Sequence, residues 1–155
     1  MTDSPKSPST PPKNQQTGDE TMFADRDNPL TVEQGNLFSP KFDSDGLIPA
    51  IVTEVGQAQV LMFAFMDAKA LQLSISTRQA HFFSRSRNRL WKKGEESGNT
   101  LQIETMRTDC DQDVVWLSVR VQGNGVACHT GEKSCFYRSV DLESEVSRPV
   151  HLTRD

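Results

Sequence analysis

Short runs of alternating or continuous apolar residues recur along the middle of the chain and predict β-strands. Six such runs stand out: Leu47–Thr53, Gln59–Met66, His81–Arg85, Leu101–Arg107, Val114–Val121 and Phe136–Val140. The turn-like residues Glu54-Val55-Gly56-Gln57 separate the first two runs and favour a β-hairpin. A sheet of short strands is therefore expected.

One segment has helical rather than extended character. Asp67 stands where an N-cap residue belongs, and a short helix is predicted from there to about Thr77. Its apolar residues are Ala68, Leu71, Leu73 and Ile75. Many short strands with one main helix predict an α+β fold, a small mixed or antiparallel sheet domain.

Both ends of the chain lack this pattern. Residues 1–36 combine several prolines with many small polar residues, which is typical of solvated, disordered chain. We therefore expect a disordered N-terminal tail over residues 1–36, a folded domain over residues 37–140 and a C-terminal tail over residues 141–155. A domain of this size buries only about 60 to 65% of its unfolded surface, so a metal or a partner subunit would help to stabilise it.

Composition narrows the class of protein. The 155 residues include 17 Lys or Arg and 21 Asp or Glu, and this acidic balance argues against generic nucleic-acid binding. The longest apolar run, Val60–Met66, is far shorter than the roughly 20 residues that span a bilayer. No secretory signal is visible, so we expect a cytoplasmic protein with no membrane or nucleic-acid partner. Its three cysteines do not suggest a disulfide framework.

The motif Asp109-Cys110-Asp111-Gln112-Asp113 offers two kinds of metal ligand. On an extended chain its three carboxylates would share one face and the Cys110 thiol would lie on the other. Carboxylates suit Mg²⁺ or Ca²⁺, whereas a thiolate selects Zn²⁺ and similar ions. Alternate residues of a straight strand lie about 6.7 Å apart, so either the chain bends here or water completes the shell. The alternative interpretation is a solvated acidic turn.

A second motif, Cys128-His129-Thr130-Gly131-Glu132-Lys133-Ser134-Cys135, supplies the other two thiols. Together with Cys110 they give three ligands, which would leave the fourth position of a tetrahedral zinc site open for water. His129 would either fill that position or act as a general acid or base beside it. Inert buried cysteines are the simpler alternative.

Spacing bears on how these thiols meet. If Val114–Val121 is a strand and residues 122–125 form a turn, a regular hairpin would hold Cys110 and Cys128 about 20 Å apart or more. We therefore hypothesise that two subunits share each zinc site, with Cys110 from one and Cys128 and Cys135 from the other.

A basic stretch forms the third motif. Five Lys or Arg residues and no acid occur between His81 and Lys93. Such a cluster suits one or two phosphates better than a polyanion, and Trp91 could stack on a base. Ser97 and Asn99 follow in a glycine-containing loop that would either hold phosphate or form a plain turn. An exposed edge strand is the alternative interpretation of the basic stretch.

Several motifs in this order closely resemble those of phosphoribosyl-AMP cyclohydrolases, enzymes of histidine biosynthesis. The matching segments are Gly46–Ala50, Ser84–Arg87, Leu90–Glu95, Ser97–Asn99, Asp109–Asp113, Ala127–Gly131 and Ser134–Arg138. The resemblance implies hydrolytic opening of the adenine ring of 1-(5-phosphoribosyl)-AMP at the C6–N1 bond, giving the formimino carboxamide ribotide. Because few residues follow Arg138, we expect the monofunctional form without the pyrophosphohydrolase domain that some members carry.

The resemblance also implies the ligands and the assembly. It places zinc on Cys110, Cys128 and Cys135, magnesium on the three aspartates of the acidic motif, and zinc sites shared between the chains of an intertwined homodimer. The three aspartates are Asp109, Asp111 and Asp113.

A mechanism follows as a hypothesis. Bound zinc lowers the pKa of water to about 7, which makes hydroxide available for attack on C6. His129 would pass the proton to the departing N1. The expected substrate-binding residues are Arg85, Arg87, Trp91, Lys92, Ser97 and Asn99.

The sequence alone is also compatible with two other functions. One is a zinc-stabilised module that binds nucleotides or RNA without catalysis, for which a closed four-ligand zinc site is expected. The other is a different zinc hydrolase, such as a deaminase, although the chain lacks the H-x-E motif of the usual zinc deaminases.

Overall fold

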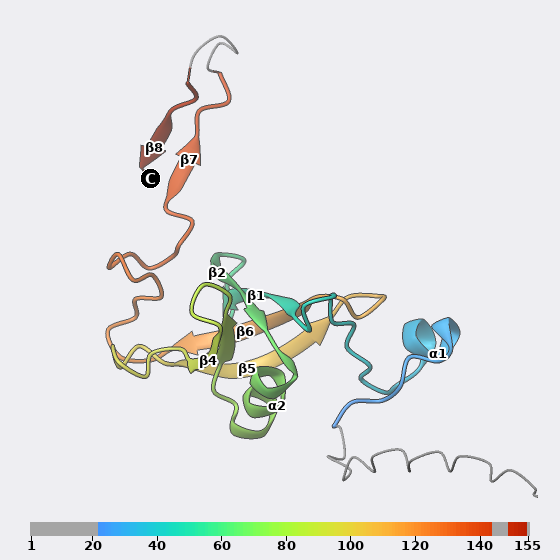
Figure 1. Cartoon of the computed structure of the whole chain (residues 1–155). Coiled ribbons are helices and arrows are strands. Elements are labelled where there is room, and N and C mark those ends of the chain that lie inside the picture. Colours follow the sequence, from blue (N-terminus) through green and yellow to red (C-terminus); the bar gives the residue numbers. More distant parts are fainter. Residues whose placement is uncertain (1–21, 144–148, 155) are drawn as a thin grey trace, which may run out of the picture.

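The predicted β-hairpin is the centre of the structure, a computed structural model that describes residues 22–143 and 149–154. It pairs β1 with β2 inside a six-stranded sheet of order β4-β3-β2-β1-β6-β5 (Figure 1). The strands are β1 (Ile48–Glu54), β2 (Val60–Met66), β3 (His81–Ser84), β4 (Arg89–Lys92), β5 (Leu101–Thr108) and β6 (Val115–Val121). β1 and β6 run parallel and the other neighbouring strands run antiparallel, so the expected α+β class with a mixed sheet is confirmed.

The sheet is strongly curled. An isolated bridge between Gln79 and Gln102 joins the chain before β3 to β5, and the N–H of Ala80 donates to the carbonyl of Leu101 at 3.0 Å. The start of β3 is thereby brought to the start of β5. Inside the curl lies one hydrophobic core, in which Phe82 is the largest completely buried side chain.

The predicted helix is α2 (Ala68–Thr77), and Asp67 caps it as expected. The carboxylate of Asp67 accepts a hydrogen bond from the N–H of Ala70 at 2.7 Å, which satisfies one of the free donors of the first turn. Of the four apolar residues that the pattern assigned to this helix, only Leu71 is fully buried, whereas Ile75 is exposed. The helix ends at Arg78, whose backbone is left-handed.

Three elements were not predicted. β4 lies in the basic stretch, and α1 (Pro29–Gln34) lies in the segment expected to be an N-terminal tail, of which residues 1–21 are outside the described residues. β8 (Leu152–Arg154) lies in the expected C-terminal tail and pairs with β7 (Arg138–Val140). These last two strands form a separate hairpin that projects from the body (Figure 1).

The direction of β5 and β6 positions the candidate ligands. Because the two strands are antiparallel, the acidic motif that joins them lies at one end of the sheet (Figure 1). The loop after β6, which holds Cys128 and Cys135, begins at the opposite end. Gly123 and Gly125 make the expected turn there with positive φ, but the following chain crosses to β2, where the N–H of Cys135 donates to the carbonyl of Leu61 at 2.7 Å.

Within the described residues, every helix is too short or too polar to cross a membrane.

Candidate metal centre and substrate cavity

The acidic motif between β5 and β6 is a turn that gathers its three carboxylates. One oxygen from each of Asp109, Asp111 and Asp113 lies within 4.8 Å of the others. The chain bends because Gln112 has a left-handed backbone with φ of 58°, and the carboxylate of Asp109 accepts from the N–H groups of Asp113 at 3.0 Å and Val114 at 3.2 Å. The strand-like alternation of faces considered for this motif therefore does not occur, and bending is what brings the oxygens together.

Charge at this turn is only partly balanced. The ammonium of Lys41 lies 3.6 Å from a carboxylate oxygen of Asp111 and 3.5 Å from one of Asp113. Partial desolvation acts to raise the pKa of Asp109, but hydrogen bonds from the N–H groups of Val114 and Asp113 outweigh it and hold that pKa below its usual value. A compact set of carboxylate oxygens fits a hard divalent cation such as Mg²⁺.

The second candidate ligand group is the pair Cys128 and Cys135, which the thiol loop (residues 127–135) brings together. Cys128 is buried and its N–H donates to the carbonyl of Glu132 at 3.0 Å. Ser134 fixes the far end of the loop by donating its hydroxyl to the carbonyl of Val60 at 2.7 Å. The two thiols consequently lie close enough for each to shift the pKa of the other.

The environment separates the acidities of these two thiols. Burial acts to raise the pKa of Cys128, but the Thr130 hydroxyl at 3.0 Å and the Thr130 backbone N–H, with weaker help from Cys135 and Lys93, bring the pKa below the usual thiol value. Burial, together with the neighbouring Cys128, raises the pKa of Cys135 to about 11. Two soft sulfur ligands, one of them readily ionised, fit part of a Zn²⁺ shell.

Lys93 is a residue of this centre that the sequence did not single out. Burial lowers its pKa, and the charges of Cys135 and Cys128 act in the opposite direction. Lys93 thus offers a positive charge to both sulfurs. The basic stretch was recognised, but only the fold shows that Lys93, rather than its neighbour Lys92, is directed at the thiol pair.

A cavity of about 190 Å³ lies beside this centre. It brings together five of the predicted site residues, namely Arg87, Trp91, Lys92, Ser97 and His129. Lys93, Gly94, Glu95 and Glu96 complete its lining. A cavity with cations, an indole ring and an imidazole suits a phosphorylated aromatic ligand.

Two predicted substrate-binding residues lie elsewhere. The guanidinium of Arg85 stacks on the ring of Phe65 at 4.0 Å and lines a different hollow. Asn99 is buried, and its side-chain oxygen accepts from the N–H of Asn124 at 3.1 Å, which ties two loops together.

Cys110 is also apart from the thiol pair. It is exposed on the acidic turn, and the seven residues of β6, at about 3.3 Å each, separate the two ends of the sheet by roughly 20 Å. One chain therefore presents an oxygen-rich group with one thiol at one end and two thiols with a basic cavity at the other.

Comparison with known proteins gives a consistent result. The family model described as phosphoribosyl-AMP cyclohydrolase matches residues 62–137. A relative named phosphoribosyl-AMP cyclohydrolase from Sinorhizobium fredii is 53% identical over 117 residues, which cover 76% of this chain and 77% of the relative. Relatives of the same name from Chelativorans sp. and Sinorhizobium medicae are 54% and 50% identical, over 77% and 84% of this chain and 84% and 86% of their own lengths.

We predict that the two clustered thiols ionise in separate steps in metal-free protein carrying Cys110→Ser. The lower step, from Cys128, should fall below the usual thiol pKa and the upper step, from Cys135, near 11. Thiolate absorbance in the ultraviolet, followed against pH, measures both steps. Thr130→Val should raise the lower step because it removes the hydroxyl that contacts Cys128, whereas Thr108→Val, at the other end of the sheet, should leave it in place. A single step at the usual thiol value would contradict this description.

Proposed function

The chain belongs to the phosphoribosyl-AMP cyclohydrolase family of histidine biosynthesis, and we propose that it opens the adenine ring of 1-(5-phosphoribosyl)-AMP with zinc and magnesium as cofactors. The observation that carries this proposal is the basic cavity with His129 beside the pair Cys128 and Cys135. In the reaction, water adds to C6 of the N1-substituted adenine and the C6–N1 bond breaks, so N1 leaves with a proton.

Zinc is assigned to Cys128 and Cys135 of one subunit together with Cys110 of the other. Three thiolates would leave one tetrahedral position open, as in catalytic rather than structural zinc sites. When bound, zinc would supply Lewis acidity that lowers the pKa of water to about 7. The closeness of two sulfurs and the adjacent charge of Lys93 support this assignment.

His129 is assigned the transfer of the proton to N1. It is exposed, follows Cys128 directly in the chain and lines the cavity, so its imidazole has access both to water and to a bound base. An imidazole suits this task because it both accepts and donates a proton near neutral pH.

The remaining cavity residues are assigned to the substrate. Trp91 would pack against the base, while Arg87, Lys92 and Ser97 would bind phosphate. Arg85 and Asn99 belong to the same proposed set, although they lie outside this cavity.

Magnesium is assigned to Asp109, Asp111 and Asp113, where it would orient a substrate phosphate. The short separation of their oxygens supports this assignment. Lys41 already places one positive charge beside two of the three carboxylates.

A homodimer is required by this proposal because one chain holds Cys110 at the opposite end from the thiol pair. Its sheet offers a surface for a second copy, since Phe63, Ile51 and Trp116 stand next to one another in register on β2, β1 and β6. Their exposed fractions are 48%, 36% and 42%. An exposed apolar row of this kind favours burial against a protein partner.

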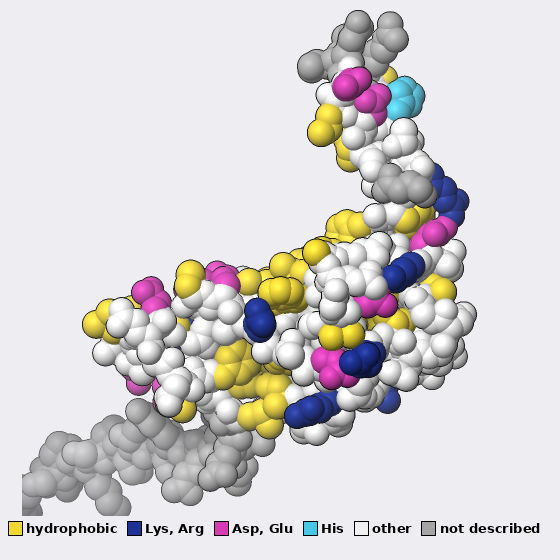
Figure 2. Space-filling model, turned by 180° about the vertical axis from the view of Figure 1, so that it is seen from behind, with side chains coloured by type: hydrophobic (Ala, Val, Ile, Leu, Met, Phe, Trp, Pro, Cys, Tyr) yellow, Lys and Arg dark blue, Asp and Glu magenta, His cyan; other side chains and the backbone are white. Residues whose placement is uncertain are grey.

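The projecting β7–β8 hairpin supports the same assembly. Hydrophobic side chains are exposed on it and on the body beneath it (Figure 2), and on the hairpin they include Val140, Leu142 and Leu152. A two-stranded hairpin is marginally stable in water by itself. A second copy would supply the surface that it lacks.

We predict that chelation abolishes ring opening and that Zn²⁺ added together with Mg²⁺ restores it. Zinc supplies the Lewis acid, so Mg²⁺ alone, the matched control, should not restore the reaction. Ultraviolet absorbance of the phosphoribosyl-AMP substrate follows the purine ring directly. Full activity in protein shown to be free of transition metal would exclude the proposed mechanism, and absence of ring opening with unfolding on chelation would favour the non-enzymatic zinc module.

Subunit mixing tests the shared site. Cys110→Ser and Cys135→Ser should each be inactive, and co-refolding equal amounts should restore about a quarter of wild-type activity, since half of the dimers are mixed and each has one intact site. Mixing Cys128→Ser with Cys135→Ser is the control. Each variant lacks a ligand from the thiol pair that one subunit supplies, so no site in a mixed dimer is intact. Mixed dimers without recovered activity would contradict the shared arrangement.

His129→Ala should lower turnover by about 100-fold or more while bound zinc stays unchanged, because the substitution removes the proton donor to N1. Turnover at saturating substrate and the metal content of the purified protein measure the two effects. His151→Ala removes an imidazole that does not line the cavity and is the control; its turnover per dimer should stay normal. Near-normal turnover of His129→Ala would remove His129 from this role.

A further inference from the structure

The acidic turn forms hydrogen bonds with a segment that lies outside residues 62–137, the part of the chain that the family model matches. We name residues 22–42 the N-terminal clasp. The beginning and the end of the clasp are joined by a hydrogen bond from the N–H of Ala24 to the carbonyl of Phe38 at 3.0 Å. Phe23 contacts Phe38 at a ring-centroid distance of 5.6 Å and Phe42 at 6.2 Å, and all three rings pack against the core. The clasp is therefore anchored to the folded body.

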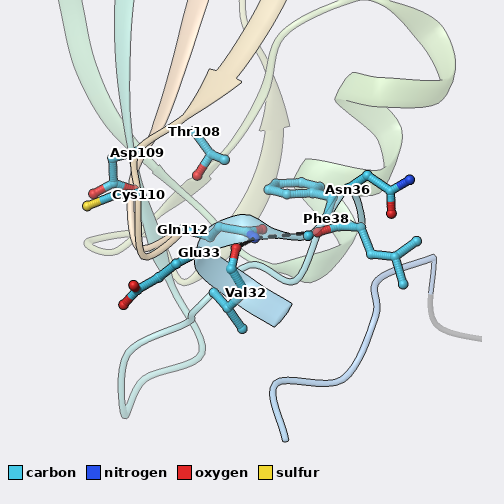
Figure 3. A pocket seen from close by; sticks show the side chains of 10 residues that line it. Val32, Glu33, Asn36, Phe38, Thr108, Asp109, Cys110 and Gln112 are labelled. Carbon is cyan, nitrogen blue, oxygen red and sulfur yellow. Dashed lines mark hydrogen bonds between the residues drawn. The ribbon is translucent and has the colours of Figure 1, made fainter. Parts of the chain in front are cut away.

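Gln112 joins the turn to this clasp through every polar atom of its side chain. Its oxygen accepts from the N–H of Ser39 at 2.7 Å. Its amide nitrogen donates to the carbonyls of Val32 at 2.8 Å and Leu37 at 3.4 Å. Figure 3 shows this side chain directed into the clasp, while Asp109 and Cys110 extend from the other side of the turn.

The same turn is held through its backbone. The N–H of Lys41 donates to the carbonyl of Gln112 at 2.7 Å. The guanidinium of Arg26 donates to the carbonyl of Asp111 at 2.8 Å and also to the carbonyl of Ser39. The residue between two of the candidate ligands is thus fixed at its side chain and at its carbonyl.

Gln112 is buried and has the left-handed backbone that a residue other than glycine adopts only when its surroundings hold it there. Without its amide, the carbonyls of Val32 and Leu37 and the N–H of Ser39 would lose a buried partner. The turn would then be free to relax. Because metal ligands must stand within a few tenths of an ångström of their ideal distance, such relaxation would separate the three carboxylates.

The clasp also forms part of the site itself. A cavity of about 320 Å³ is lined by Glu33 and Asn36 of the clasp and by Asp109 and Cys110 of the turn (Figure 3). The wall beside Cys110 therefore comes from the N-terminal segment.

We propose that Gln112 is a positioning residue that, through the N-terminal clasp, sets the spacing of the Asp109, Asp111 and Asp113 carboxylates for a divalent cation. This inference rests on the magnesium assignment of the proposed function. The role belongs to the amide of Gln112 and to Arg26, neither of which would contact the cation or the substrate.

The test uses Mn²⁺ as a probe for Mg²⁺. Its binding to the full-length, zinc-loaded protein is measured by electron paramagnetic resonance. Gln112→Gly removes the amide yet accepts the left-handed backbone, and it should weaken Mn²⁺ binding about 10-fold or more, as loss of partners behind metal ligands typically does. Arg78→Gly is the matched control, since it changes a left-handed residue at the end of α2, and it should bind Mn²⁺ normally. Arg26→Ala, a milder change, should weaken binding several-fold and provides the readout if Gln112→Gly does not fold.

Ring opening supplies the second readout. In the folded Gln112→Gly variant, a higher Mg²⁺ concentration should be needed for activity, and raised Mg²⁺ should recover most of kcat. A purely structural role of Gln112 would instead lower the thermal midpoint and leave the Mn²⁺ affinity of the folded protein unchanged. Wild-type Mn²⁺ affinity in both Gln112→Gly and Arg26→Ala would overturn the inference. Loss of Mn²⁺ affinity in the variants supports it even if the wild-type protein opens no purine ring, an outcome that would overturn only the proposed function.

Discussion

The fixed length and register of β6 are the constraint on which the site depends. Val115, Leu117 and Val119 are completely buried at alternate positions of this strand, between parallel β1 and antiparallel β5. A shift of one residue would turn these side chains to the opposite face, so the register cannot slip without loss of the core. The acidic turn before β6 and the thiol loop after it are therefore held at opposite ends of the sheet, and neither end carries all three thiols.

The two ends are also complementary in charge. The acidic turn has three carboxylates beside the ammonium of Lys41, while the cavity at the other end has three cations, Arg87, Lys92 and Lys93, against two carboxylates, Glu95 and Glu96. In the proposed symmetric dimer, an acidic end meets a basic end twice, because a two-fold axis repeats every contact. Assembly would then complete the proposed zinc ligand set and bring the cations of the cavity near the carboxylates of the acidic turn.

The sequence predicts those parts of the structure that depend on a local pattern of side chains. It does not predict the parts that depend on contacts with the backbone of distant segments. The first hairpin and the Asp67 cap follow from local patterns, and the structure has both. For the three aspartates the pattern left open whether the chain bends, and only the structure shows the bend at Gln112 that brings their oxygens together. β4 was missed because only the two central residues of its four are apolar and charged residues flank them, and α1 because its six residues bury only Val32. Sequence adjacency could not distinguish Lys93 from Lys92, because only the fold determines which cation lies near the sulfurs.

Gln112 is the extreme case of this distinction. Its side chain binds a carbonyl of Val32, a carbonyl of Leu37 and an N–H of Ser39, all of them backbone groups far away in the sequence. Such contacts constrain the path of the clasp but not the identity of most of its side chains. Polar residues at many positions of this segment are therefore compatible with both an ordered clasp and disordered chain. The contacts that depend on residue type include the three phenylalanine rings, Arg26 and Lys41. A functional element of this kind gives no hydrophobic period and no motif, so it becomes visible only when the hydrogen bonds of the turn are traced to their partners.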